Sequence, residues 1–379
     1  MDYYIYQKEL INLRRFLHRH PETAFKEFKT TAFIKNYLEK IGYEVKSYTP
    51  TGCSAFLELD KNYPTVVLRA EIDAVPITER ADVDYKSENE GAMHACGHDA
   101  NIAVVLVLAK MAYEKRDMKC NIRFLFEPAE EQGKGSAEMI RQGVLENPKA
   151  DYFIMFHFAN KETWGLEINH YAASATVGRF DIKVNGNAVH WCIREKGRDA
   201  LFAGAKVAVM LNDMNDSYKS KNPFCIGVGM LESGTSSNMM AESAILSGGI
   251  RTYTVDEYNA IAEKIKENIQ KIANETGTEI KADISREPIL PIVNDKQMTE
   301  KADIVGKKVF KDEFYPIDFL FLAGDNASAY FKYTKGIFMV FRCKHVDERY
   351  TLHNSRYIMD DSRLYKAVEM LHKFIKELK

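Results

Sequence analysis

Apolar runs alternate with amphipathic segments through the first half of the chain. The amphipathic pattern of residues 5–42 predicts two helices, and Gly42 ends the second of them. A further helix is expected from about Asn101 to Lys115. Buried strands are predicted at residues 65–70, 122–127 and 152–158. Alternating strands and helices of this kind are typical of an α/β sheet.

The pattern changes after Gly178. We expect, in order, a strand at 179–184, a helix at 199–213, strands at 224–231 and 244–252, a helix at 255–276 and a strand at 279–285. This β-α-β-β-α-β order is that of the ferredoxin-like split unit, which can fold as a domain of its own. Helices at 296–309 and 362–378 and a strand at 336–341 then complete the first domain. The expected domains are therefore 1–177 with 288–379, and an inserted domain of 178–287.

Length and charge narrow the class of protein. A chain of 379 residues exceeds the size at which one core keeps growing, so two domains are the default expectation. Its 52 basic and 54 acidic residues give a formal net charge of -2, so it has no overall field to attract nucleic acid or an anionic membrane. A small molecule is the expected partner.

The amino-terminal segment lacks the pattern of an export signal. Asp2 and Glu9 stand where a secretory signal would carry basic and then unbroken apolar residues, and no stretch of about 20 apolar residues follows elsewhere. We therefore expect a cytoplasmic protein without a membrane span. Six cysteines scattered along a chain of this kind are expected to be thiols and not a disulfide framework.

Residues 93–99, with the sequence MHACGHD, carry the densest group of metal-ligating side chains. Cys96 and His98 stand two residues apart, so in an extended segment both side chains point to one face and can share a metal ion. Gly97 between them lets the backbone bend closely. This spacing predicts a metal site immediately before the helix expected near Asn101.

Three further segments offer ligand-type side chains at the ends of predicted strands. Glu130 and Glu131 follow the strand at 122–127, His157 ends the apolar run at 152–156, and His353 follows the last strand. One of the adjacent carboxylates can ligate a metal while the other acts as a base, which suits metal-assisted hydrolysis. Taken alone, each signal has an ordinary structural explanation. Together, at the strand ends where open α/β sheets place their chemistry, they favour a metal-dependent hydrolase.

Several motifs carry a resemblance to a known family. They are LHRHPE at 17–22, LRAEIDAVP at 68–76, HACGHD at 94–99, PAEE at 128–131 and LHN at 352–354. Through them the chain resembles, nearly end to end, the amidohydrolase branch of the aminoacylase and carboxypeptidase metallohydrolases. That branch includes hippurate hydrolases, N-acetyldiaminopimelate deacetylases and plant hydrolases of auxin conjugates. The resemblance implies a zinc-peptidase-like α/β catalytic domain with a mixed central sheet flanked by helices.

The resemblance also implies two divalent metal ions, either Zn, Mn, Co or Ni, because all accept mixed nitrogen, oxygen and sulfur ligands. In the family pattern Cys96 bridges the two ions. His98 and His157 complete one site, and Glu131 and His353 complete the other.

By the same resemblance Glu130 is the general base. Asp73 and Asp99 are expected to orient a ligating imidazole through its other nitrogen. An equally ordinary explanation for both aspartates is a turn or a helix cap. Asn101 departs from the pattern, because a second histidine is usual there.

The inserted domain is implied to be a lid and dimerisation domain. His190 falls where family members place a histidine that reaches a partner's active site and steadies the oxyanion. Asn238 and Arg251 match lid positions that bind the substrate carboxylate. The segment from Trp191 to Ile193 is bulkier than the small residues expected after His190, and Asp325-Asn326 also departs from the family pattern.

These residues together predict hydrolysis of the amide bond of an N-acetyl or N-aroyl amino acid by a homodimeric enzyme. A dipeptidase or carboxypeptidase is the alternative within this chemistry, because the same centre can cleave a peptide bond. A silent metal-binding scaffold is the alternative of another class. Loss of Glu130 or of a ligand would favour the scaffold, and none is lost.

Overall fold

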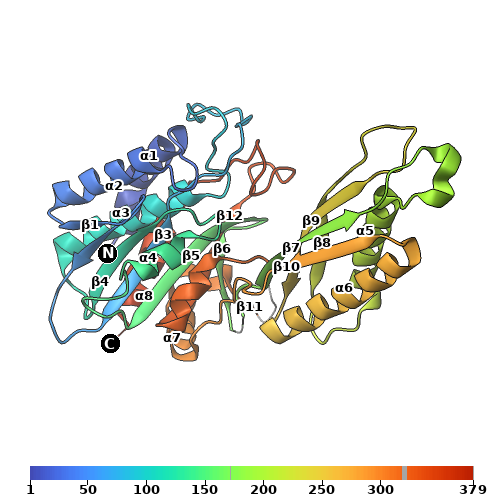
Figure 1. Cartoon of the computed structure of the whole chain (residues 1–379). Helices are drawn as coiled ribbons and strands as arrows, with labels where there is room; N and C mark the ends of the chain where they lie inside the picture. The colour runs from blue at the N-terminus through green and yellow to red at the C-terminus, as the bar shows by residue number, and fades with distance from the viewer. Residues whose placement is uncertain (171, 318–321, 379) are drawn as a thin grey trace. The chain divides into compact units, whose positions relative to one another are not determined.

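The computed structural model describes residues 1–170, 172–317 and 322–378, and the described chain divides into two compact units (Figure 1). The first unit contains Met1–Ala173, a segment that begins at Val293 and a last segment that begins at Asn326. The second contains Ser174–Ile292 and a short segment that ends at Asp325. The predicted insertion, residues 178–287, lies wholly within Ser174–Ile292.

An eight-stranded mixed sheet forms the centre of the first unit, with the strand order β1-β2-β4-β3-β5-β12-β6-β11. Strand β3 is parallel to its neighbours β4 and β5, and β5 is parallel to β12. The pairs β1-β2, β2-β4 and β6-β12 are antiparallel. The bounds are β1 Val45–Ser47, β2 Cys53–Leu57, β3 Thr65–Glu71, β4 Asn121–Glu127, β5 Tyr152–Lys161, β6 Gly165–Asn169, β11 Phe314–Ile317 and β12 Lys335–Lys344. The mixed α/β sheet is as predicted.

The helices of this unit bury most of the apolar positions that predicted them, although Phe16 is 42% exposed. Leu10, Leu13 and Leu17 of α1 are buried, and Gly42 ends α2 in the left-handed region at φ +116°, where its N–H bonds the carbonyls of the last turn. The bounds are α1 Gln7–Arg19, α2 Phe28–Ile41, α3 His98–Lys115, α4 Gly135–Arg141, α7 Lys296–Phe310 and α8 Tyr365–Ile375, with short 3-10 helices η1 Tyr3–Tyr6, η3 Lys311–Glu313 and η4 Asn326–Lys332. Among these, α3 is buried along nearly its whole length.

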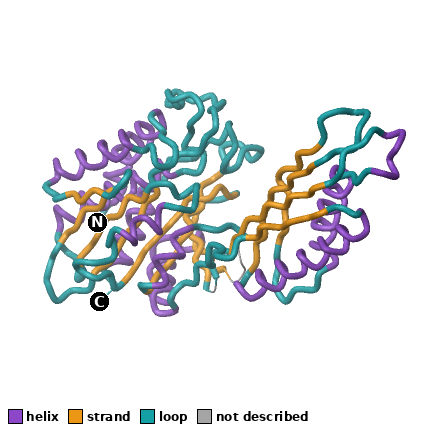
Figure 2. The backbone as a smooth tube through the Cα atoms, in the orientation of Figure 1, coloured by secondary structure: helices purple, strands orange, loops and turns teal. Residues whose placement is uncertain are grey.

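The second unit is a four-stranded antiparallel sheet in the order β10-β7-β9-β8 (Figure 2). Helices α5 and α6 pack against it and close a separate apolar core. Its elements are β7 Thr176–Asn185, η2 Trp191–Lys196, α5 Ala200–Ser217, β8 Cys225–Ser233, β9 Ser243–Thr252, α6 Val255–Thr276 and β10 Glu279–Ile284. Along β7, buried and more exposed residues alternate, as expected of a strand with one covered face.

No helix of the described residues combines the length and the apolar character that crossing a bilayer requires. All six cysteines are free thiols, as expected from their spacing. Cys53, Cys120 and Cys343 are buried, whereas Cys192 and Cys225 are exposed. Cys96 is partly buried, and its surroundings are distinct from those of the others.

Candidate metal centre

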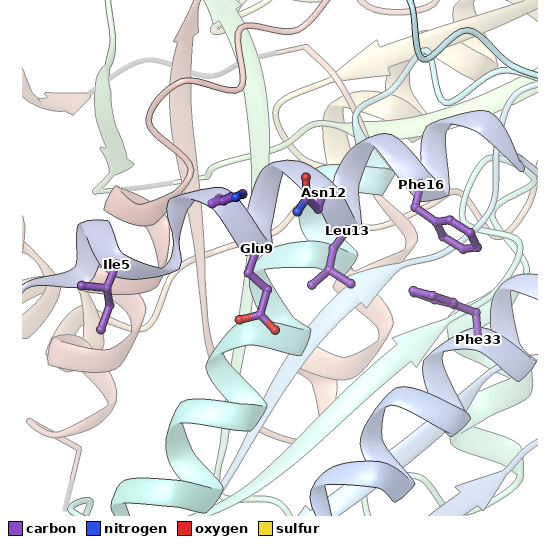
Figure 3. A pocket seen from close by; sticks show the side chains of 7 residues that line it. Ile5, Glu9, Asn12, Leu13, Phe16 and Phe33 are labelled. Carbon is purple, nitrogen blue, oxygen red and sulfur yellow. The ribbon is translucent and has the colours of Figure 1, made fainter.

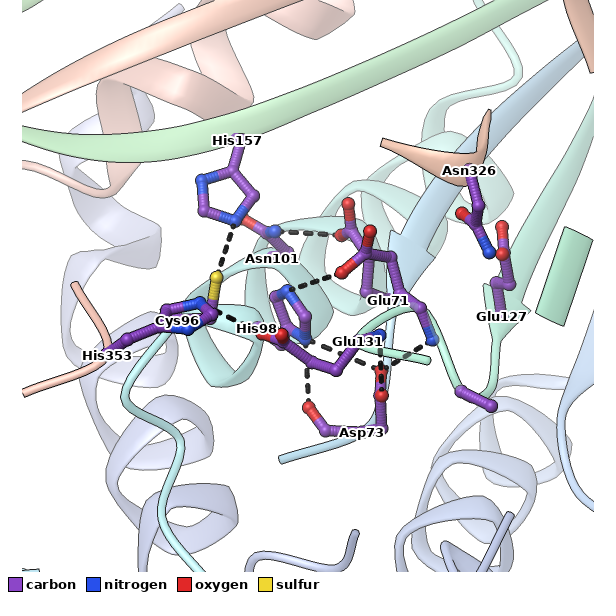
Figure 4. Close-up of polar contacts among 12 residues, drawn as sticks. Glu71, Asp73, Cys96, His98, Asn101, Glu127, Glu131, His157, Asn326 and His353 are labelled. Atoms are coloured by element: carbon purple, nitrogen blue, oxygen red, sulfur yellow. Dashed lines mark hydrogen bonds and ion pairs between the residues drawn. The ribbon is translucent and has the colours of Figure 1, made fainter. Parts of the chain in front are cut away.

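Ligand-type side chains from four segments of the first unit lie close together (Figure 4). The segments are the turn before α3, the loop after β4, strand β5 and the loop that contains His353. Cys96, His98 and His157 form one group in which the ligand atoms all lie within 4.8 Å of one another. Within this group the Cys96 Sγ and His157 Nε2 atoms are 3.4 Å apart. Cys96, Glu131 and His353 form a second group under the same limit. Cys96 therefore lies where one thiolate can serve two cations.

These separations fit metal ions. Zinc lies about 2.0–2.1 Å from nitrogen and about 2.3 Å from sulfur, so two tetrahedral ligands of one ion lie roughly 3.5 Å apart. The Cys96–His157 pair at 3.4 Å and the Glu131–His353 pair at 3.2 Å are close to this value. The Nε2 atom of His98 is buried and has no hydrogen-bond partner among the described residues, as expected of an atom reserved for a metal. His98 also groups with Glu130 and Glu131. The donor set therefore suits one or two divalent cations.

Backbone carbonyls fix the orientation of two of the imidazoles. His98 Nδ1 is 2.9 Å from the carbonyl oxygen of Asp73, and His157 Nδ1 is 2.7 Å from that of Phe158. A carbonyl oxygen only accepts hydrogen bonds, so each Nδ1 carries the proton and each Nε2 carries the lone pair. Both rings are thus held in the tautomer that presents Nε2 to a metal.

The local path at Cys96 differs from the prediction. The prediction of an extended segment was wrong, because Cys96 lies in a turn and α3 begins at His98. Gly97 makes the turn in the left-handed region, at φ +85°, which favours glycine. The turn, and not strand alternation, brings Cys96 and His98 together.

Asp73 holds the two adjacent glutamates. Its carboxylate oxygens accept the backbone N–H groups of Glu130 at 3.1 Å and of Glu131 at 3.0 Å. The side chains then separate: Glu131 Oε1 lies 3.2 Å from His353 Nε2, whereas Glu130 Oε2 lies 4.0 Å from His98 Nε2. Both carboxylates lie near His98, but only Glu131 also groups with Cys96 and His353.

Asp99 has a different environment, although it follows His98 directly in the sequence. Its carboxylate accepts from Arg14 Nε at 2.9 Å and contacts His18 Nδ1 at 2.8 Å, within the buried interior. It therefore orients the imidazole of His18 and not that of a candidate ligand. Of the two aspartates predicted to support the ligands, Asp73 contacts one and Asp99 instead joins α3 to α1.

His353 and His157 reach the centre from different backbone settings. His353 adopts φ +65° in a loop, and its N–H bonds the carbonyl oxygen of Ala95 at 2.9 Å, which ties the loop to the segment of Cys96. His157 lies inside β5 and not at its end, because β5 continues to Lys161 through its pairing with β12. Side-chain exposure is 52% for His353 and 1% for His98, so the two groups differ in their access to solvent.

The pKa values of Glu131 and Cys96 depend on the charges around them. Burial alone would raise the pKa of Glu131, but His353 and His98 lower it to about 2. Burial raises the pKa of the Cys96 thiol above its usual range. A cation bound at this position would lower the pKa of the Cys96 thiol again, because metals hold a coordinating thiol deprotonated.

The second unit holds the three residues predicted to act in the lid. His190 pairs with Met239 in an isolated bridge, and the carbonyl oxygen of Asn238 accepts the N–H of Trp191, so His190 and Asn238 are neighbours. Arg251 lies near the other end of β9, where its Nη1 donates to the carbonyl oxygen of Leu322 at 2.8 Å. The sheet thus brings two of the three residues together and separates Arg251 from them.

A family model described as peptidase family M20/M25/M40 matches residues 67–377 of the chain. The chain belongs to this family. The finding confirms the family that the motifs predicted.

A curated protein is similar to the chain in sequence, and solved structures share its fold. The chain is 30% identical over 386 residues to the N-acetyl-L-cysteine deacetylase of Bacillus subtilis, covering 98% of this chain and 88% of the relative. A dinuclear metal-binding M20 peptidase of Bacillus subtilis has the same fold, with a TM-score of 0.81 and 24% identity over 99% of this chain and 100% of that one. The aminobenzoyl-glutamate utilization protein of Klebsiella pneumoniae aligns with a TM-score of 0.70 and 18% identity over 99% and 97% of the two chains.

A buried polar cluster beside the M20 ligand group was not predicted (Figure 4). The guanidinium of Arg69 pairs with Glu71 and donates from Nε to Glu127 at 2.8 Å, and Asn101 Nδ2 donates to Glu71 at 2.8 Å. Arg69 and Glu71 are two residues apart on β3, so the period of two was the signal that placed them on one face. Asn101, the departure from the family pattern, therefore has a partner in Glu71.

A surface groove in the first unit lies apart from this chemistry (Figure 3). It has a volume of about 470 Å³ and follows α1 and α2. Its lining residues are Ile5, Lys8, Glu9, Asn12, Leu13, Phe16 and Phe33. This lining contains no histidine or cysteine and one carboxylate, and that carboxylate pairs with Lys110 at 3.0 Å. The groove therefore does not belong to the metal centre.

Proposed function

We propose that this M20 family member is a metal-dependent hydrolase that cleaves the amide bond of an N-acyl amino acid and releases a carboxylate and a free amino acid. The observation that carries the proposal is the meeting of Cys96, His98, His157, Glu131 and His353 with a second carboxylate, that of Glu130, beside them. The Bacillus subtilis relative named as an N-acetyl-L-cysteine deacetylase supports amide hydrolysis of this substrate class.

Two divalent cations, either Zn, Mn, Co or Ni, are proposed at this centre. Cys96 would bridge them, with His98 and His157 on one side and Glu131 and His353 on the other. The relative described as a dinuclear metal-binding peptidase supports this number. When bound, such cations lower the pKa of a water molecule and polarise an acyl oxygen.

The residues of the chain would then carry the proton and hold the substrate. Glu130 is proposed to take the proton of the attacking water and to return it to the leaving nitrogen. Asp73 would keep Glu130 in place through its backbone N–H. His190 would donate a hydrogen bond to the oxyanion, and Asn238 and Arg251 would hold the substrate carboxylate.

The second unit is proposed to be a ferredoxin-like lid that pairs with a second copy of the chain. Ser243 and Arg251 are eight residues apart on β9, so at about 3.3 Å per residue roughly 25 Å separates the end near His190 from Arg251. One small substrate cannot span that distance, so a site that contains Arg251 needs both His190 and its neighbour Asn238 from a partner chain. Exposed Leu201, Phe202 and Val209 of α5 offer an apolar surface for pairing. We propose a cytoplasmic homodimer.

A substrate panel tests the proposal. The purified chain, stripped with a chelator and reloaded separately with Zn, Mn, Co and Ni, is assayed on N-acetyl amino acids, N-benzoyl amino acids and dipeptides. We expect hydrolysis of an acyl amino acid that the chelator abolishes and added metal restores. Cleavage of dipeptides alone would replace the proposed reaction with a peptidase. Absence of metal binding, measured by elemental analysis, would remove the mechanism.

A further inference from the structure

The imidazole of His190 has an unusual neighbour in the second unit. His190 caps the 3-10 helix η2, and its Nδ1 atom accepts the backbone N–H of Cys192 at 3.3 Å. The Sγ atom of the same cysteine lies 3.1 Å from the same Nδ1. This cysteine is one of the residues that make the segment after His190 bulkier than the family pattern. Two groups of one residue therefore converge on one ring nitrogen.

The polarity of these contacts favours one tautomer of His190. A backbone N–H only donates, so it favours a lone pair on Nδ1 and, in a neutral ring, a proton on Nε2. At 3.3 Å this contact is longer than the usual range of about 2.7–3.2 Å, so by itself it holds the tautomer only weakly. The Cys192 thiol, with Sγ 3.1 Å from Nδ1, is a second donor to the same lone pair. A thiolate would instead need a proton on Nδ1, and that proton would face the backbone N–H. The Nε2–H of His190 is then a hydrogen-bond donor that points away from the cysteine.

We propose that Cys192 is a positioning residue for His190, which it holds as the Nε2–H tautomer, and that chemical modification of the Cys192 thiol slows the reaction. The inference rests on the proposed function, in which His190 donates to the oxyanion. Cys192 touches neither substrate nor metal in this scheme. Its effect passes through the imidazole alone. A hydrogen-bond donor that already points at the oxyanion needs little reorganisation in the transition state, which lowers the activation free energy.

Both residues are exposed, so substitutions here remove little packing. Cys192→Ala removes the thiol and keeps the backbone N–H, whereas Cys192→Ser keeps a donor of similar size. Cys225, the other exposed cysteine, lies on β8 and supplies a matched control in Cys225→Ala. Each variant is made in the full chain and reloaded with the metal that gives the wild type its highest activity.

Two measurements test the inference. Imidazole nitrogen NMR near pH 7.5, about one unit above the usual histidine pKa and about one below that of a cysteine thiol, reports the tautomer of His190, whose signals are assigned by their loss in His190→Asn. We expect the Nε2–H form in the wild type and in Cys192→Ser, and a mixed signal in Cys192→Ala, which keeps only the long backbone contact. Steady-state kinetics should show kcat lowered about three- to tenfold in Cys192→Ala with KM unchanged, the range for one lost hydrogen bond, and recovery in Cys192→Ser.

Alkylation with iodoacetamide gives a third readout. It should lower kcat in the wild type and in Cys225→Ala, and leave Cys192→Ser unaffected. An unchanged ring signal with unchanged kcat in Cys192→Ala overturns the inference, and so does a rise in KM alone, because that would indicate substrate binding. If the wild type hydrolyses no acyl amino acid, the proposed function fails, and the NMR comparison still decides whether Cys192 sets the tautomer.

Discussion

Replacing Asp73 by asparagine should weaken metal binding without unfolding the chain. Asp73 accepts the backbone N–H groups of Glu130 and Glu131 through its two carboxylate oxygens, and its carbonyl oxygen accepts from His98. Asp73→Asn turns one of those oxygens into an N–H donor that faces another donor. At least one hydrogen bond to a charged acceptor is lost, which costs about 1.5–3 kcal/mol. Metal affinity should fall roughly 10- to 100-fold, since about 1.4 kcal/mol corresponds to tenfold.

Asp99→Asn is the matched control. It changes the neighbour of His98 in the same way, but the carboxylate it removes accepts from Arg14 and contacts His18. Because Arg14 is almost fully buried, weakening this pair should lower the free energy of unfolding by up to about 3–5 kcal/mol. Competition with a chromogenic chelator gives the metal affinity, and urea unfolding gives the stability. We expect Asp73→Asn to lower mainly the metal affinity and Asp99→Asn to lower mainly the free energy of unfolding.

The pH dependence separates the two effects further. Burial alone would raise the pKa of Asp99, but Arg14 and His18 lower it below its usual range. A carboxylate whose pKa is lowered by folding stabilises the fold fully above its unfolded pKa of about 3.9 and loses that contribution as the pH falls towards the folded value. The stability gap between wild type and Asp99→Asn should therefore shrink below about pH 4. Burial lowers the pKa of His18, but its hydrogen bonds with Asp99 and Glu79 raise it above the usual value, so the gap should also shrink as the pH rises above about 6.5. Equal losses of metal affinity in both variants would refute the reasoning.

Three further predictions concern the centre and the lid. Glu130→Gln should keep its metal and lose turnover, whereas Glu131→Gln should lose metal at one site, and equal metal loss in both by elemental analysis would contradict their separate roles. Cys96 should react with a thiol reagent more slowly in the metal-loaded protein than in the stripped one, because a ligated thiolate is protected. Arg251→Ala should cost about 2 kcal/mol or more in kcat/KM on substrates with a free carboxylate, and much less on the matching amides.

The sequence predicted the long elements well and their ends less well. The apolar run of β5 stops near Phe158, so the strand was expected to end there, but pairing with β12 carries it on to Lys161. The short strands β1, β2, β6 and β11 were not predicted, because three to five residues show too little periodicity to identify. Their places depend on partners that are distant in the sequence.

The residues of the metal centre were predicted more fully than those that support them. Ligand-type side chains such as Cys96 and His98 can be recognised in a sequence by residue type and spacing. The residues that orient these ligands can be recognised only by their contacts in the folded chain. The family resemblance implied that Asp99 supports a ligand, but successive side chains of a helix diverge by about 100°, and Asp99 faces α1. Arg69 was missed because its partners, Glu127 and Asn326, lie 58 and 257 residues away.

The unequal exposure of His98 and His353 has a consequence for how such a centre acquires its ions. A cation held by the buried His98 and the partly buried His157 would be less accessible to solvent and would leave more slowly, so its identity would be decided when the protein first binds it. A cation held by Glu131 and the half-exposed His353 would exchange with the surroundings. In the proposed two-metal centre, the ion at Glu131 and His353 would then change with the metal ions available in the surroundings. The ion at His98 and His157 would remain the one that was bound first.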